Sequence, residues 1–469
     1  MEHVHFIGIG GTGLSAIATV LLERGYTVSG SDYQESVTTR HLEALGAQVF
    51  IGHRGEQVAG ADLVVRSSAI ADSNLEVQAA LAAGIPVLKR EDFLEQLMAG
   101  QQGIAVAGTH GKTTTTAMLA WLLTDLKRDP SFVIGSPSLD LGGSAHAGTG
   151  QFFVIEADEY DRMFLGIHPY VAVVTNVEHD HPDCYPTPQE FMQAFNEFVS
   201  QIEPGGILVA CGDDPGAAKL MANARSNGQR TASYGMQAEE LDYRATQLNL
   251  NRWGGFDFDV YRRDSERLAR LHLRVPGKHN VLNAMAALSV SDYLGLNADA
   301  VANSLDDFHG TNRRFEVRGI AAGVTIIDDY AHHPTEIRAT LSAARARFPG
   351  QEIWAVWQPH TYSRTRTLMA DFIKSFGDAD HVLITEIFAA REEPPADGFS
   401  ARQIVKAMTS GPEPLNSDVY FAPDLDSALS LILEHVQPGQ VVLVLSAGDA
   451  NQISERLLRT LPAHNTSPN

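Results

Sequence analysis

The sequence predicts an α/β protein, because short apolar runs of strand length alternate with helical stretches along most of the chain. Two of these apolar runs lead into glycine-rich turns that are followed by a helix, a pattern typical of parallel sheets. The chain has 469 residues, which is too long for one hydrophobic core. At roughly 100–200 residues per domain, we expect about three domains.

The first predicted domain, residues 1–100, opens with a strand at 4–7 that runs into a glycine turn at 8–13 and then a helix. A second strand ends at Asp32, about 20 positions after the turn, as in dinucleotide-binding domains. Glycines in such a turn let the backbone approach a diphosphate closely. We therefore expect a Rossmann-like fold with a phosphate-bearing ligand at this turn.

The second predicted domain, residues 101–315, carries the strongest local signal. An apolar strand at 103–107 enters the sequence GTHGKTTT at 108–115, and a helix follows it. Backbone N–H groups of such a loop and helix N-terminus bind phosphate oxygens. Lys112 would place a positive charge on the β- and γ-phosphates, and the Thr113 hydroxyl would ligate Mg²⁺. The segment predicts a P-loop-type nucleotide site.

Two further apolar strands of this domain end in acidic and histidine-bearing segments. The strand at 152–155 precedes Glu156, and the strand at 171–175 leads to a segment that contains His181. In parallel sheets, ligands collect at the carboxyl ends of the strands. We therefore expect Glu156 and His181 near the triphosphate as metal ligands or as partners of metal ligands.

Two more regions complete the predicted architecture. Alternating apolar residues between 241 and 274 predict a small antiparallel β piece within the central domain. Residues 316–461, with apolar strands such as 353–357 and 441–445, predict a second Rossmann-like domain. The last residues, 462–469, are polar and are expected to be disordered.

Composition narrows the class of partner. The net charge of −22 argues against nucleic acid, because phosphate backbones require a basic surface. The apolar runs are of strand length, so we expect no membrane insertion. The first residues have no basic stretch and no cleavage site, so we expect no secretion. The chain has only two cysteines, Cys184 and Cys211, which suits a reducing cytoplasm. No obligate protein partner is evident.

Taken together, the motifs resemble those of the Mur ligases of bacterial cell-wall synthesis. The resemblance extends over all three predicted domains, and the alanine-adding members of the family are the most similar. The motifs, in chain order, are GTHGKTTTT at 108–116, EADEYD at 156–161, HDHPDCY at 179–185, GKHNVLNAMAA at 277–287, GTNRRFE at 310–316, DDYAHHPTE at 328–336, QPHTYSRTR at 358–366 and SAGDAN at 446–451.

The resemblance implies both an architecture and a reaction. It implies an N-terminal domain for a UDP-sugar, a central ATPase domain and a C-terminal domain for the incoming amino acid. In this reaction, ATP phosphorylates the lactyl carboxylate of UDP-N-acetylmuramate, and the amino group of L-alanine attacks the resulting acyl phosphate. The product is a peptidoglycan precursor, so the activity would support cell-wall biogenesis, cell shape and cell division.

The resemblance also assigns residue roles, position by position. Lys112, Glu156 and His181 would be catalytic, and Thr113, Glu156 and His181 would hold Mg²⁺. ATP would contact Gly108, Thr109, His110, Gly111, Lys112, Thr113, Thr114, Asn280, Asn283, Arg314, Asp329, Tyr330 and His332. The other substrates would contact Gly10, Gly11, Gly13, Asp32, Ser67, Ser68, His360 and Arg364. Thr361 stands where some members carry a further arginine, so the site for the alanine carboxylate is expected to differ in detail.

Three alternatives remain at this point. The N-terminal glycine turn with Asp32 also fits an NAD-dependent oxidoreductase, although that function would leave the Gly-Lys-Thr loop without a role. A related ligase that attaches a whole tripeptide during wall recycling would share the ATP and UDP-sugar sites. A non-catalytic nucleotide-binding protein of the same fold is the third alternative, and ATP turnover would separate it from both ligases.

Overall fold

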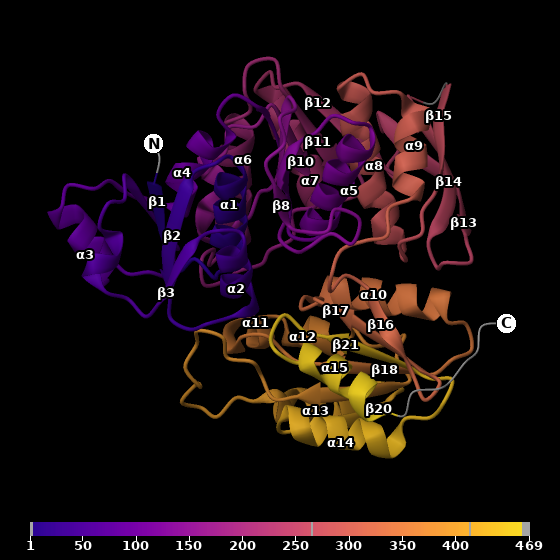
Figure 1. Ribbon diagram of the computed structural model, residues 1–469. Coiled ribbons are helices and arrows are strands. Elements are labelled where there is room, and N and C mark those ends of the chain that lie inside the picture. The colour runs from indigo at the N-terminus through magenta and orange to yellow at the C-terminus, as the bar shows by residue number, and fades with distance from the viewer. Residues whose placement is uncertain (1–2, 264–265, 412–413, 462–469) are drawn as a thin grey trace.

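The computed structural model describes residues 3–263, 266–411 and 414–461. It contains three sheets, each in its own α/β domain, as the sequence predicts (Figure 1). The N-terminal and central domains lie side by side, and the C-terminal domain lies below both in the view of Figure 1. The expected disorder of residues 462–469 concerns a segment outside the described residues.

The N-terminal sheet has five parallel strands in the order β3-β2-β1-β4-β5. The strand order reverses next to β1, so its carboxyl end, where the glycine turn lies, is a ligand-binding position in a Rossmann-like sheet. The elements are β1 (His3–Ile7), α1 (Thr12–Glu23), β2 (Thr27–Asp32), α2 (Val37–Ala44), β3 (Gln48–Ile51), η1 (Gly55–Val58), β4 (Leu63–Arg66), α3 (Leu75–Ala82), β5 (Val87–Lys89) and α4 (Arg90–Met98).

The central sheet has ten strands in the order β15-β14-β13-β12-β11-β10-β6-β9-β7-β8. The expected antiparallel piece is confirmed as the meander β13-β14-β15 at one edge. The strands are β6 (Gln102–Ala107), β7 (Ser131–Val133), β8 (Ala145–His146), β9 (Phe152–Glu156), β10 (Val171–Val174), β11 (Ile207–Cys211), β12 (Thr231–Gly235), β13 (Tyr243–Leu250), β14 (Phe256–Arg262) and β15 (Glu266–His272). The helices are α5 (Lys112–Asp125), η2 (Tyr160–Gly166), α6 (Pro188–Ser200), α7 (Pro215–Ser226), α8 (Lys278–Tyr293) and α9 (Ala298–Asp306).

The C-terminal sheet has six strands in the order β16-β17-β21-β18-β19-β20, parallel except for the antiparallel pair β16-β17. Its strands are β16 (Glu316–Ala321), β17 (Val324–Asp329), β18 (Ile353–Trp357), β19 (His381–Thr385), β20 (Asp418–Ala422) and β21 (Val441–Leu445). Its helices are α10 (Pro334–Arg347), α11 (Tyr362–Thr367), α12 (Met369–Ile373), α13 (Ala401–Ser410), α14 (Leu425–His435) and α15 (Asn451–Thr460).

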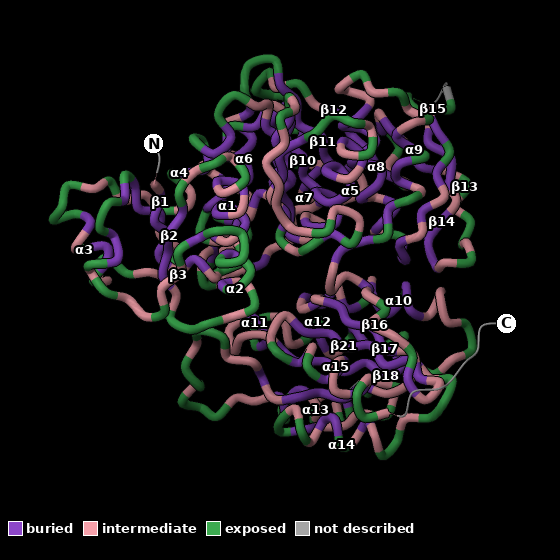
Figure 2. The backbone as a smooth tube through the Cα atoms, in the orientation of Figure 1, coloured by how far each residue is buried: buried purple, intermediate pink, exposed green. Residues whose placement is uncertain are grey.

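The strands that the sequence pattern predicts are mainly those that are buried on both faces of a sheet. Strands at the sheet centres, such as β10, β18 and β21, are buried at every residue, as expected where helices cover both faces (Figure 2). The edge strands β16 and β20 are mostly half-buried or exposed, and the sequence pattern predicted neither of them; in β16, Arg318 and Gly319 interrupt the apolar residues. Within the described residues, no helix has both the length and the apolar character needed to cross a membrane.

Candidate active site

The predicted phosphate loop joins β6 to α5. Gly111 adopts a left-handed conformation at φ 81°, and a Cβ atom there would lie 2.6 Å from Oδ1 of Asn283. Gly108 has φ 132°, and its Cβ would lie 2.1 Å from the hydroxyl of Thr175. Only glycine fits both positions. Gly111 also caps α5 without a side chain, so the first N–H groups of the helix remain free to bind an anion.

The residues after β10 hold this loop in place. The backbone N–H of His110 donates to Oδ1 of Asn176 at 2.8 Å, and its carbonyl accepts from the Thr175 hydroxyl at 2.6 Å. The Thr109 hydroxyl donates to the carbonyl of Glu178 at 2.7 Å. The loop geometry is therefore set before any ligand binds, which lowers the entropic cost of binding phosphate.

The Lys112 side chain reaches back to the first residue of the phosphate loop, Gly108. Its ammonium donates to the carbonyl of Gly108 at 2.6 Å and pairs with Glu159 at 2.8 Å. Burial would lower the pKa of Lys112, but the carboxylates of Glu159 and Asp158 outweigh burial and raise it. A fully charged ammonium is thus held beside the loop, where it can stabilise phosphate oxygens.

The predicted metal ligands lie on one cavity of about 570 Å³, which Thr113, Glu156 and His181 all line. The Thr113 hydroxyl donates to Oε1 of Glu156 at 3.0 Å, and the backbone N–H of Gly135 donates to the other carboxylate oxygen at 2.7 Å. Burial raises the pKa of Glu156, because the positive charges of Lys112 and Arg314 only partly offset the loss of hydration of its carboxylate. The hydroxyl and the carboxylate beside the phosphate loop are oxygen ligands of the kind that a hard divalent cation prefers, and His181 lines the same cavity.

The C-terminal domain contributes to the same cavity through Arg364 and His360. Nε of Arg364, on α11, donates to Oδ1 of Asp180 at 2.9 Å, and both side chains are buried. Burial disfavours ionisation of Asp180, but His181 and Arg364 hold its pKa well below the ordinary value. This buried ion pair joins the central and C-terminal domains at the cavity wall.

His360 is neutral and has a defined tautomer. Burial and the charge of Arg364 lower the pKa of His360 to about 4. Nη1 of Arg364 lies 3.2 Å from Nδ1 of His360, and the guanidinium can only donate, so the His360 proton is on Nε2. The two side chains therefore offer N–H donors to a carboxylate. The neighbouring Thr361 has a left-handed backbone, φ 62°, where the chain turns into α11.

A second cavity of about 310 Å³ adjoins the loop and is lined by Gly111, Asn280, Asn283, Arg314 and Asp329, with His110 and Thr114. Asn283 donates to Oδ1 of Asn280 at 2.9 Å, which fixes the orientation of the Asn283 amide. Asp329 accepts the backbone N–H groups of Phe315 and Ala331, each at 2.7 Å. Burial raises its pKa to about 6.

Arg314, Tyr330 and His332 also line the larger cavity, at the start of the C-terminal domain. The guanidinium carbon of Arg314 lies 5.2 Å from the centre of the Tyr330 ring, within cation–π range. Nη2 of Arg314 reaches the Thr113 hydroxyl at 3.5 Å, so it links this segment to the phosphate loop. Burial lowers the pKa of His332 to about 3, which leaves its ring neutral.

The N-terminal glycine turn is held by its acidic residue. The backbone N–H of Gly10 donates to Oδ2 of Asp32 at 2.8 Å, so this oxygen supports the turn itself. Of the predicted substrate residues in this domain, Gly13 lines the larger cavity, beside Arg90. The described cavity lining does not include Gly10, Gly11, Asp32, Ser67 or Ser68.

Sequence reasoning did not single out several charged residues that line the larger cavity, among them Arg90, Asp180 and Glu336. Asp180 immediately precedes His181, and that position is the only sequence signal for it. Glu336 follows His333 at the spacing of a capping box, which indicates a helix start but no ligand. Arg90, at the start of α4, has no sequence signal, because it meets the cavity only through domain packing.

Three family models match successive parts of the chain. They are "Mur ligase family, catalytic domain" at residues 3–102, "Mur ligase middle domain" at 106–291 and "Mur ligase, glutamate ligase domain" at 313–448. The UDP-N-acetylmuramate–L-alanine ligase of Geobacter sp. strain M21 is 42% identical over 464 residues, which cover 99% of this chain and 98% of that relative.

Solved structures agree with these matches. The UDP-N-acetylmuramate–alanine ligase of Thermotoga maritima is similar at a TM-score of 0.81 and 28% identity, covering 98% of this chain and 99% of that one. A murein peptide ligase from Psychrobacter arcticus is similar at a TM-score of 0.72 and 26% identity, with 100% of both chains covered. The Geobacter relative is 42% identical over 99% of this chain, and family models match all three domains. The chain therefore belongs to the Mur ligase family.

Proposed function

We propose that this protein joins L-alanine to the lactyl carboxylate of UDP-N-acetylmuramate, with ATP as the energy source, in peptidoglycan precursor synthesis. One observation carries the proposal: Lys112 of the phosphate loop and Arg364 of the C-terminal domain line the same cavity of about 570 Å³. A nucleotide phosphate and an amino-acid carboxylate can therefore be bound within one site. The relative of known name with 42% identity supports the choice of alanine.

The reaction needs ATP because a carboxylate is a poor acyl donor. Transfer of the γ-phosphoryl group to a lactyl carboxylate oxygen releases ADP and gives an acyl phosphate. The alanine amine then attacks the acyl carbon, phosphate leaves with the former carboxylate oxygen, and the nitrogen loses a proton to form the amide. Both steps depend on holding the reacting groups together and neutralising phosphate charge.

Lys112 and the metal ligands would supply that neutralisation. Lys112 is already charged and held beside the loop by Glu159, so it can move onto phosphate oxygens without gaining a proton. Thr113, Glu156 and His181 would hold Mg²⁺ beside the phosphate loop. When bound, the ion withdraws charge from the transferred phosphoryl group.

The remaining substrates would occupy the neighbouring surfaces. The adenine would bind in the smaller cavity beside Asn280 and Asn283, because that cavity adjoins the phosphate loop and carries fixed amide groups. The UDP diphosphate would bind at the glycine turn of Gly10, Gly11 and Gly13. Ser67 and Ser68 would form the neighbouring wall of that site.

The alanine carboxylate would be bound by Arg364 and His360. The neutral His360 presents its Nε2 proton, and Arg364 retains donors beyond those bound to Asp180. Asp180 fixes the guanidinium in position. Thr361 is uncharged, whereas some members of the family carry arginine at this position. Arg364 is therefore the only cation that the family pattern predicts at the site of the alanine carboxylate.

We also propose a cytoplasmic location. Both cysteines, Cys184 and Cys211, are free. Burial raises the pKa of Cys211 to about 12, so this thiol stays protonated and unreactive. Unpaired thiols of this kind suit a reducing compartment.

Arg364→Lys tests the alanine site. Lysine keeps the charge but loses the planar set of N–H donors. We expect the KM for L-alanine to rise by about 10- to 100-fold, the cost of one or two charge-assisted hydrogen bonds, with the KM for ATP nearly unchanged. Arg366→Lys is the matched control, since Arg366 lies on the same helix but is half-exposed and pairs with Asp397. An unchanged KM for alanine in Arg364→Lys would contradict this assignment.

A further inference from the structure

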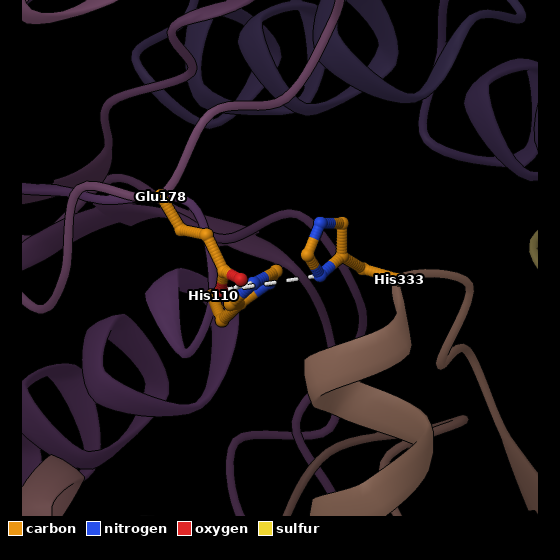
Figure 3. Close-up of side chains that lie close together, drawn as sticks. All are labelled: His110, Glu178 and His333. Atoms are coloured by element: carbon orange, nitrogen blue, oxygen red, sulfur yellow. Dashed lines mark hydrogen bonds and ion pairs between the residues drawn. The ribbon is translucent and has the colours of Figure 1, made fainter. Parts of the chain in front are cut away.

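Three side chains that have no role in the chemical steps proposed above meet between the central and C-terminal domains, although the resemblance places His110 among the residues that contact ATP. His110 lies in the phosphate loop, Glu178 follows β10, and His333 precedes α10 (Figure 3). One donor atom from each lies within 4.8 Å of the other two. We call these residues the His–Glu–His cluster. None of them is among the proposed magnesium ligands.

The donor atoms of the cluster face one another. Nε2 of His110 lies 3.1 Å from Oε2 of Glu178, and Nδ1 of His333 lies 4.0 Å from the same oxygen. The centres of the two imidazole rings are 4.7 Å apart. Nδ1 of His333 accepts the backbone N–H of Thr335 at a long 3.3 Å, so this nitrogen is unprotonated and has the lone pair that a metal ligand needs.

Outer partners orient two of the three side chains in the way that metal ligands require. Nδ1 of His110 pairs with Oε1 of the mostly buried Glu336 at 3.2 Å, which leaves Nε2 for the cluster. The Thr335 hydroxyl donates to Oε1 of Glu178 at 2.9 Å, which leaves Oε2 for the cluster. A carboxylate on the outer nitrogen of a ligating histidine is a regular feature of zinc sites.

From this geometry we propose that the His–Glu–His cluster binds one divalent transition-metal ion of the Zn²⁺ class. Two imidazoles and one carboxylate form a three-ligand set that suits Zn²⁺ or Co²⁺, with water in the fourth position. Mg²⁺ prefers an all-oxygen shell and is a poor match for two imidazoles. Glu178 is 41% exposed, which gives an ion access from solvent, whereas His333 is buried and neutral.

Metal binding would replace interactions within the cluster, namely the ion pair between His110 and Glu178 and the hydrogen bond from Thr335 to His333, by bonds to the ion. Without the metal, His110 and Glu178 form an ion pair, because both carboxylates at His110 favour its charged form. On binding, the Nε2 proton of His110 leaves to solvent, its lone pair ligates the ion, and Glu336 still accepts from Nδ1. The long hydrogen bond from Thr335 to His333 is replaced by a metal–nitrogen bond. The affinity should therefore increase with pH up to about 9, where His110 loses this proton.

The ion would tie two domains together. His110 and Glu178 belong to the central domain, and His333 begins the first helix of the C-terminal domain. Residues of all three domains line the larger cavity, so a metal bond between two of these domains would oppose any separation of the domains during turnover. Zn²⁺ bound here should inhibit turnover without competing with Mg²⁺, and a chelator should relieve the inhibition.

Cobalt titration of the full-length, nucleotide-free protein, after treatment with EDTA and its removal, tests the site directly. Four-coordinate Co²⁺ has a strong visible absorption, and Zn²⁺ should displace it. We expect one equivalent per chain in the wild type. In His333→Asn, the asparagine still caps α10 but lacks the imidazole. It should lower the affinity for Co²⁺ by at least about 10-fold and remove the visible band.

Two further variants keep the result decisive. Glu178→Gln retains the hydrogen bond from Thr335 and should also lose the band. His146→Asn is the matched control, because His146 likewise lies between two carboxylates, Glu23 and Asp129, but is half-exposed. This variant should bind Co²⁺ like the wild type. Unaltered Co²⁺ affinity in both cluster variants would overturn the proposal. So would loss of the band in Glu156→Gln alone, which would place the ion at the proposed magnesium site.

Discussion

The ion pair between His110 and Glu178 makes a sharp prediction about stability and pH. Burial would lower the pKa of His110, but the carboxylates of Glu178 and Glu336 outweigh burial and raise it from 6.5 to about 9. A histidine whose pKa is raised on folding contributes stability that is fully present below 6.5 and is lost as the pH rises through 9. Replacing Glu178 by glutamine should remove part of that contribution and keep the hydrogen bond to Thr335.

The magnitude follows from the size of the shift. A rise from 6.5 to about 9 corresponds to about 3 kcal/mol of stabilisation of the charged His110. Glu178 provides one of two carboxylates and is 41% exposed, so solvent screens its interaction. We therefore expect Glu178→Gln to lower the free energy of unfolding by about 1 kcal/mol at pH 6. The pKa of Glu178 itself is lowered to about 2, so its carboxylate is charged throughout this range.

Denaturant unfolding in the presence of EDTA, followed by tryptophan fluorescence at pH 6 and pH 10, measures this difference. The deficit of Glu178→Gln should be present at pH 6 and absent at pH 10. Glu35→Gln is the matched control, because Glu35 pairs with Arg40 at a well-exposed position and should show no such pH dependence. A deficit of equal size at both pH values would refute the reasoning.

The phosphate loop and the metal ligands give further predictions. Lys112→Ala should lower the rate of phosphate release by about 10²–10³-fold or more with the fold retained, as circular dichroism would verify; near-wild-type turnover would contradict the role of Lys112. Glu156→Gln and His181→Ala should each raise the Mg²⁺ concentration that gives half-maximal activity, and an unchanged titration curve would show that neither holds the ion. Zn²⁺ should inhibit the wild type, with His333→Asn several-fold less sensitive.

Much of the fold could be predicted from the sequence because its signals are local. The buried strands are continuous apolar runs. The glycines of the loop at 108–111 are followed directly by Lys112 and the start of a helix. Glu156 and His181 were predicted to line one site because each follows a buried strand, and both line the larger cavity. These predictions needed only periodicity and the rule that ligands bind at the carboxyl ends of parallel strands.

The contacts between domains could not be predicted in this way. Arg364 binds Asp180 across 184 positions of sequence, and Thr335 binds Glu178 across 157. Such pairs depend on how one domain packs on another, and a single sequence carries no signal for that packing. The His–Glu–His cluster was missed for the same reason, because its members come from three segments that lie far apart in the sequence.

The rate of amide formation with alternative amino donors tests the central claim most directly. Purified protein would be incubated with UDP-N-acetylmuramate, ATP and Mg²⁺, together with L-alanine, glycine, L-serine or the tripeptide, and both phosphate and the UDP-linked product would be measured. We predict that L-alanine gives the highest kcat/KM, by about 10-fold or more over glycine, since one methyl group contributes about 1–3 kcal/mol. Efficient ligation of the tripeptide with poor use of L-alanine would contradict the account and indicate a recycling ligase.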